Sequence, residues 1–124
     1  MNKTILITGA SGFVGKHLVE ALKNHYTVIS CVRQISGVKN EIVVDLLDES
    51  AIELIVNALE DRKLKIDCII HTAAYIAKTE NAKSYSLYEN NMVISKHIIG
   101  LCQAINIESL INFSSMAVYP NRSG

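Results

Sequence analysis

Three glycines near the amino terminus, Gly9, Gly12 and Gly15, have the spacing of a phosphate-binding loop. They follow a short apolar run at residues 5–7 and precede a pattern typical of a helix. In such a strand–loop–helix unit the first glycine permits a sharp turn, the second lets a diphosphate approach the backbone, and the third lets the helix pack closely. Because the helix start adds unpaired N–H groups and a positive dipole end, the spacing predicts a dinucleotide-binding loop rather than a glycine-rich turn without a ligand. The residues expected to bind the cofactor here are Gly9, Ser11, Gly12, Phe13, Val14 and Gly15.

Arg33 stands where a dinucleotide-binding fold distinguishes two cofactors. It directly follows the apolar run at residues 27–32, which is expected to be the second strand. An acidic residue near this point binds the adenosine ribose hydroxyls of NAD, whereas an arginine accommodates the 2′-phosphate of NADP. A guanidinium can pair with phosphate through two hydrogen bonds, and an aspartate would repel it. The sequence therefore favours NADP, with NAD as the alternative if Arg33 is an ordinary solvated residue at a strand end.

The spacing Thr8-Gly9-x-x-Gly12-x-x-Gly15 resembles that of the extended short-chain dehydrogenase/reductase family, of the NAD-dependent epimerase/dehydratase type. The resemblance extends from the first apolar run to about Tyr119. It implies an oxidoreductase that moves a hydride between a substrate carbon and the nicotinamide. It also implies a sugar nucleotide or another small carbonyl compound as substrate, without separating these classes.

The resemblance assigns roles to residues further along the chain. Asp45-Leu46 matches a pair that lies beside the adenine ring, although Asp45 could instead cap the following turn. Ala73 and Ala74 match small residues that let the backbone pass close to the cofactor. Asn91 matches an asparagine that steadies the long helix against the active-site strand, since a buried amide needs partners; a half-exposed asparagine without that role is the alternative. His71 is expected to pack inside its strand end rather than to act in catalysis.

The resemblance implies only part of a catalytic site. Ser115 takes the place of a serine or threonine whose hydroxyl binds the reacting oxygen of the substrate. A tyrosine and a lysine spaced Y-x-x-x-K normally follow; the lysine lowers the pKa of the tyrosine, which transfers the proton. No tyrosine of this sequence has a lysine four residues later. We therefore expect residues 1–124 to be the N-terminal NAD(P)-binding part of such an enzyme, truncated before the catalytic pair and the substrate lobe and inactive alone. The alternative is a non-catalytic dinucleotide-binding module, or a degenerate remnant that acts through a partner chain.

The elements that must position these residues can be read from hydrophobic periodicity. Unbroken apolar runs are typical of strands buried on both faces of a parallel sheet. Strands are expected at residues 4–8, 27–32, 41–44, 67–72 and 110–114, and helices at 12–24, from 48–50 onward, and at 84–105. The predicted fold is α/β, a Rossmann-like doubly wound parallel sheet with strand order 3-2-1-4-5.

Helical spacing also predicts which side chains each helix buries. The expected faces are Val14, Leu18, Ala21 and Leu22 for the first helix; Ile52, Ile55, Val56 and Leu59 for the second; and Leu87, Asn91, Ile94, Ile98, Leu101, Cys102 and Ile105 for the third. Ser50 and Glu53 have the spacing of a capping box at the start of the second helix.

Composition excludes several classes of partner. The 124 residues carry 12 basic and 12 acidic side chains with no basic stripe, so neither nucleic acid nor an anionic membrane is expected as a partner. No apolar run has the length of a membrane span. The three cysteines occur singly, as in a reduced cytoplasmic protein, and no metal site is expected. The fifth strand would lie at a sheet edge, which predicts a homo-oligomer formed through that strand or the long helix.

Overall fold

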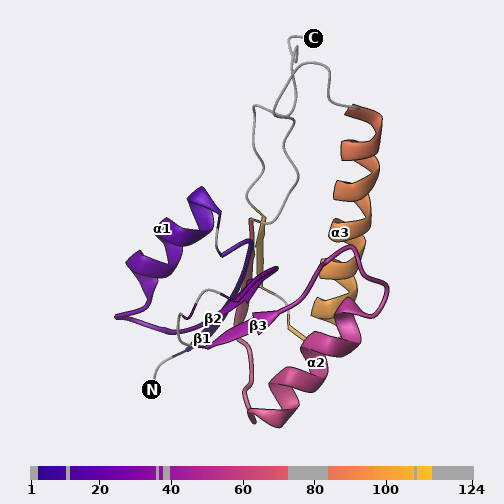
Figure 1. Ribbon diagram of the computed structural model, residues 1–124. Helices are drawn as coiled ribbons and strands as arrows, with labels where there is room; N and C mark the ends of the chain where they lie inside the picture. Colours follow the sequence, from indigo (N-terminus) through magenta and orange to yellow (C-terminus); the bar gives the residue numbers. More distant parts are fainter. Residues whose placement is uncertain are drawn as a thin grey trace.

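The predicted strands form one parallel sheet in the computed structural model of the chain (Figure 1), which describes residues 3–10, 12–35, 37, 40–72, 84–107 and 109–112. The strands are β1 (Thr4–Thr8), β2 (Thr27–Val32), β3 (Glu41–Val43), β4 (Cys68–His71) and β5 (Leu110–Asn112). They are hydrogen-bonded in the order β3-β2-β1-β4-β5, and every neighbouring pair is parallel. The predicted fold class and strand order are confirmed.

Helices cover both faces of this sheet. The helices are α1 (Phe13–Leu22), α2 (Ala51–Asp61) and α3 (Ser84–Ala104). Figure 1 shows α1 on one side of the sheet and α2 with α3 on the other. Since α1 connects β1 to β2 and α2 connects β3 to β4, the chain builds one half of the sheet and then crosses to build the other.

Each face of the sheet has its own hydrophobic core. Along β1 the side chains alternate, with Leu6 on the α2/α3 side and Ile5 and Ile7 on the α1 side. This alternation explains why the strand is apolar throughout, because both of its faces are covered. The most deeply buried residues on the α2/α3 side are Leu6, Ile29, Ile55, Ile69, Ile98 and Leu101.

The predicted buried face of α1 is partly wrong. Val14 and Ala21 are exposed, and Leu18, Val19 and Leu22 pack against the sheet. The cause is Gly15, the buried residue of this helix, because its close contact with the preceding loop decides which side of the helix faces the sheet. The face therefore centres on Gly15 and not on Val14. By contrast, Ile55 and Leu59 of α2 and Ile94, Ile98 and Leu101 of α3 are buried as predicted.

The predicted capping box at α2 does not form. The hydroxyl of Ser50 donates to Asp48 Oδ1 at 2.9 Å, and the backbone N–H of Ser50 donates to the same oxygen at 3.0 Å. Ser50 makes no side-chain cap to the helix. The Ser50 hydroxyl is held by the Asp48 carboxylate two residues earlier, and its oxygen accepts no N–H of the helix. The same two hydrogen bonds lower the pKa of Asp48.

Candidate dinucleotide-binding site

Among the described strands, the glycine loop lies where the direction of chain winding reverses. β1 pairs with β2 on one side and with β4 on the other, and the loop begins where β1 ends. In open α/β sheets, ligands bind outside the carboxyl ends of the strands at this kind of switch point. The sheet therefore places the three glycines at the expected ligand position.

The backbone of the loop depends on glycine at two positions. Gly9 has a φ of 67°, in the left-handed region that favours glycine. A Cβ at Gly15 would collide with the Gly9 carbonyl and would lie 2.8 Å from Ala10 Cα, so this position has no room for a side chain. The sharp turn and the close helix packing predicted for these glycines are thus observed. The approach of a diphosphate at Gly12 stays a prediction.

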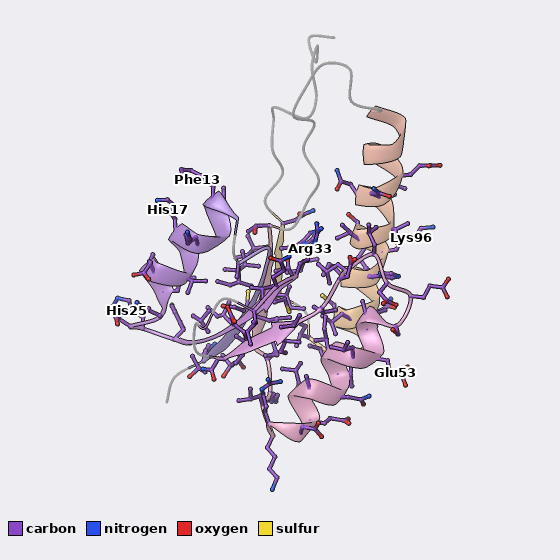
Figure 2. All side chains as sticks on the ribbon, in the orientation of Figure 1. Phe13, His17, His25, Arg33, Glu53 and Lys96 are labelled. Atoms are coloured by element: carbon purple, nitrogen blue, oxygen red, sulfur yellow. The ribbon has the colours of Figure 1, made fainter. Side chains whose placement is uncertain are left out.

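The amino end of α1 fits an anion. Its N-cap is Gly12, which has no side chain to accept hydrogen bonds from the helix amides, and the described first turn contains no acidic residue. No carboxylate of this first turn therefore opposes the positive end of the helix dipole. Figure 2 shows Phe13 at this end of α1 with His17 further along the helix. The Phe13 ring is 80% exposed, and its carbonyl oxygen accepts a hydrogen bond from His17 Nδ1 at 2.9 Å.

A buried polar pair joins the ends of β1 and β4 beside the loop. Thr8 and His71 are partners in the sheet register, are 0% and 6% exposed, and place the Thr8 Oγ1 and His71 Nδ1 atoms 2.7 Å apart. Burial lowers the pKa of His71 to about 4, so the imidazole is neutral at pH 7. The expected packing role of His71 is confirmed. Thr8 was not predicted as its partner, although a polar residue at the same end of two apolar runs was the available signal.

Arg33 lies at the carboxyl edge of the sheet, directly after β2. Its side chain is exposed, and Figure 2 places it at the same end of the sheet as Phe13. An exposed guanidinium at this edge can meet a phosphate without first being removed from a buried site. Its assignment to the 2′-phosphate of a cofactor stays a prediction.

Asp45 and Leu46 occupy the edge beyond β3. Asp45 Oδ1 accepts the backbone N–H of Leu47 at 3.0 Å, so the turn-capping alternative is observed. The adenine contact stays a prediction, because a carboxylate has a second oxygen. Leu46 is buried in the α2/α3 core, and its carbonyl oxygen accepts a hydrogen bond from His97 Nδ1 of α3 at 2.6 Å. His97, which connects this edge to the long helix, is not predicted by any local sequence pattern.

Comparison with known proteins identifies the family. The family model of the NAD dependent epimerase/dehydratase family matches residues 5–124. The chain belongs to this family. The UDP-glucose 4-epimerase of Caenorhabditis elegans is 34% identical over an alignment of 139 positions, which covers 93% of this chain and 38% of the relative.

Solved structures of similar proteins share the fold. The UDP-N-acetylglucosamine 4-epimerase of Bacillus cereus superposes with a TM-score of 0.74 at 26% identity, covering 98% of this chain and 38% of that one. A short-chain dehydrogenase/reductase superfamily protein of Agrobacterium tumefaciens with bound NAD superposes with a TM-score of 0.72 at 25% identity, covering 94% and 34%. The resemblance stated from the glycine spacing is confirmed. The chain spans little more than a third of the length of these relatives.

Several predicted site residues lie outside the described part of the chain. These are Ser11, Ala73, Ala74 and Ser115. Asn91 is described on α3 and is half-buried, and its steadying role stays a prediction. Across residues 3–10, 12–35, 37, 40–72, 84–107 and 109–112, no group of three or more acidic, histidine or cysteine side chains is placed to hold a metal ion. No helix within these ranges is both long and apolar enough to cross a membrane.

Proposed function

We propose that this chain is the dinucleotide-binding part of an NAD(P)-dependent sugar-nucleotide epimerase, dehydratase or reductase. The observation that carries the proposal is the glycine loop, in which Gly9 is left-handed, Gly15 has no space for a Cβ, and Gly12 begins α1 at the switch point. Membership of the NAD dependent epimerase/dehydratase family supports it, and so do the UDP-sugar epimerase names of the relatives. The proposed substrate is a sugar nucleotide, with another small carbonyl compound as the alternative.

The residues of this chain would divide the work of holding the cofactor. The amides at the start of α1 bind the diphosphate through the partial positive charge of the helix end. Asp45 and Leu46 would lie beside the adenine, and the small residues Ala73 and Ala74 would let the backbone pass close to the cofactor. When bound, the nicotinamide supplies a hydride acceptor and donor. Ser115 then positions the reacting oxygen of the substrate with its hydroxyl.

NADP is the cofactor that the proposal favours over NAD. Arg33 is exposed at the end of β2, where a guanidinium can form paired hydrogen bonds with a 2′-phosphate.

Three free thiols, Cys31, Cys68 and Cys102, support a reducing compartment and thus a cytoplasmic enzyme. Burial raises the pKa of Cys31 to about 12, so this thiol is neutral and unreactive.

These 124 residues alone should bind cofactor without turning over substrate. They contain no Y-x-x-x-K pair, so the groups that would move the proton in the parent family are missing from this sequence. A non-catalytic module that senses or holds a dinucleotide is the alternative. Turnover of a UDP-sugar by the purified chain would contradict this part of the proposal, and binding without turnover agrees with it.

A titration with reduced cofactor tests the central proposal. NADPH and NADH are added to the chain while nicotinamide fluorescence is followed, and saturable binding is expected. Gly12→Ala should weaken binding about tenfold or more while the fold survives, because the new methyl lies 3.3 Å from the Gly9 carbonyl oxygen at the place where the diphosphate approaches.

Gly100→Ala is the matched control for this titration. Its Cβ would meet only the flexible end of Ile52 on α2, remote from the loop, so cofactor binding should not change. Failure of the wild-type chain to bind either cofactor overturns the proposal, as does equal binding by Gly12→Ala.

A further inference from the structure

A cluster of hydrogen bonds joins the end of β4 to the glycine loop. Thr72 follows β4, and its hydroxyl donates to the carbonyl oxygens of Thr8 at 2.6 Å and Gly9 at 3.3 Å. The backbone N–H of Thr72 donates to the hydroxyl oxygen of Thr8 at 3.1 Å, and this oxygen also contacts His71 Nδ1. The carboxyl ends of β1 and β4 are therefore joined by side chains as well as by the sheet ladder.

The Gly9 carbonyl is the point at which this cluster reaches α1. Besides the Thr72 hydroxyl, its oxygen accepts the backbone N–H of Gly12 at 3.0 Å, and Gly12 is the N-cap of α1. The same carbonyl group leaves no room for a side chain at Gly15. The orientation of this one group thus links Thr72 on one side to Gly12 and Gly15 on the other.

We propose that Thr72, supported by Thr8 and His71, is a positioning residue that holds the Gly9 carbonyl in the orientation required for diphosphate binding. The effect on the cofactor rests on the proposed function, whereas the effect on the loop is a property of the chain alone. Thr72 touches neither cofactor nor substrate in this role. It acts through the Gly9 carbonyl and the Gly12 amide.

Thr8 and His71 are suited to hold Thr72 in place. Both are buried, so water competes weakly for their hydrogen bond. A neutral imidazole can accept the Thr8 hydroxyl proton at Nδ1, which leaves the Thr8 oxygen to accept the N–H of Thr72. The hydroxyl of Thr8 can thus donate to His71 Nδ1 while its oxygen accepts the backbone N–H of Thr72.

Amide hydrogen exchange in the cofactor-free chain tests the link to the loop. Thr72→Val keeps the side-chain shape but removes the hydroxyl, so the N–H of Gly12 should exchange roughly tenfold faster. Thr72→Ser should restore the wild-type rate. Thr27→Val, at the amino end of β2, is the matched control and should leave Gly12 unchanged. The buried β2 amide of Ile29 reports global stability, so an increase shared equally by Ile29 would overturn the positioning role.

A second pair of variants keeps the test decisive if Thr72→Val does not fold. His71→Leu removes the polar group behind Thr8 and should also accelerate exchange at Gly12. His71→Asn, which can place an oxygen or nitrogen near the position of Nδ1, should remain close to wild type. Equal rates at Gly12 in these two variants would contradict the proposal.

Ligand titration separates this inference from the proposed function. ADP-ribose carries the diphosphate and adenosine does not, so Thr72→Val should lose about tenfold in affinity for ADP-ribose and nothing for adenosine. If the wild-type chain binds neither ligand, the proposed function fails, and the Gly12 exchange rates still decide the positioning role. If Thr72→Val binds ADP-ribose as tightly as wild type does, the proposal that Thr72 positions the diphosphate site is wrong.

Discussion

At the scale of single residues, Arg33 offers the sharpest test of cofactor choice. It is exposed at the carboxyl edge of the sheet, so an added phosphate can reach it directly. A charged hydrogen bond to phosphate contributes enough that Arg33→Asp should lower NADPH affinity roughly ten- to hundredfold and leave NADH affinity unchanged or higher. Fluorescence titration of both cofactors measures the ratio.

Lys65→Asp is the control for the Arg33 substitution. It makes the same change in net charge, but Lys65 precedes β4 and so lies at the amino end of the sheet, away from the proposed site. It should leave both affinities near the wild-type values. A wild-type chain that binds NADH more tightly than NADPH would rule out the proposed role of Arg33.

His71 predicts how stability depends on pH. Burial lowers its pKa from 6.5 to about 4, so the unfolded chain binds more protons than the folded one between these values. The free energy of unfolding contributed by this group is therefore fully present above pH 6.5 and is lost as the pH falls toward 4. The loss should be about 3 kcal/mol. Urea unfolding at several pH values measures this free energy, and its decrease between pH 6.5 and pH 4 should be smaller in His71→Asn than in wild type.

At the scale of elements, the packing of α1 depends on a contact that only glycine permits. A Cβ at Gly15 would meet backbone atoms of Gly9 and Ala10, which cannot move without displacing the helix or the loop. Gly15→Ala should therefore cost about 1–3 kcal/mol in the free energy of unfolding. Gly100→Ala should cost less, because the Ile52 side chain it meets can rotate. Equal losses in urea unfolding would show that the helix start is more adaptable than the structure indicates.

Local sequence patterns predict the extents of the elements better than the packing between them. Strands β1 and β2 have the predicted bounds, because each apolar run is flanked by polar or turn-forming residues. The buried face of α1 could not be read from periodicity alone, since a contact between Gly15 and the loop sets the rotation of the helix. The Thr8–His71 pair was not predicted because it depends on sheet register between segments far apart in sequence. Local patterns thus predicted the elements and the loop, while contacts across the sheet decided how the site is supported.

At the scale of the whole molecule, the two faces of the sheet are covered unequally, and the residues of the edge strand β5 are exposed. The α2/α3 side holds a core that reaches from β3 to β4, whereas among the described helices only α1, with partly buried side chains, covers the other side. All three residues of β5 are exposed, and among the described strands β5 pairs only with β4. Exposed apolar strand edges are favourable sites for pairing with another chain.

Self-association through β5 is the prediction that follows from this imbalance. A homo-oligomer could form through β5 or through α3. Ile111 is 49% exposed on β5, and Ile99 is similarly exposed on α3, so a substitution at each residue tests one of these two surfaces. Ile111→Lys should raise the dissociation constant of the oligomer about tenfold or more if β5 forms the contact, because a charge on an edge strand disfavours pairing. Ile99→Lys is the matched substitution on the helix and should have little effect in that case. Sedimentation velocity over a concentration series measures the dissociation constants of both variants.

If Ile99→Lys weakens the oligomer and Ile111→Lys does not, the contact is formed by α3. A wild-type chain that stays monomeric over the whole soluble range contradicts self-association by either surface.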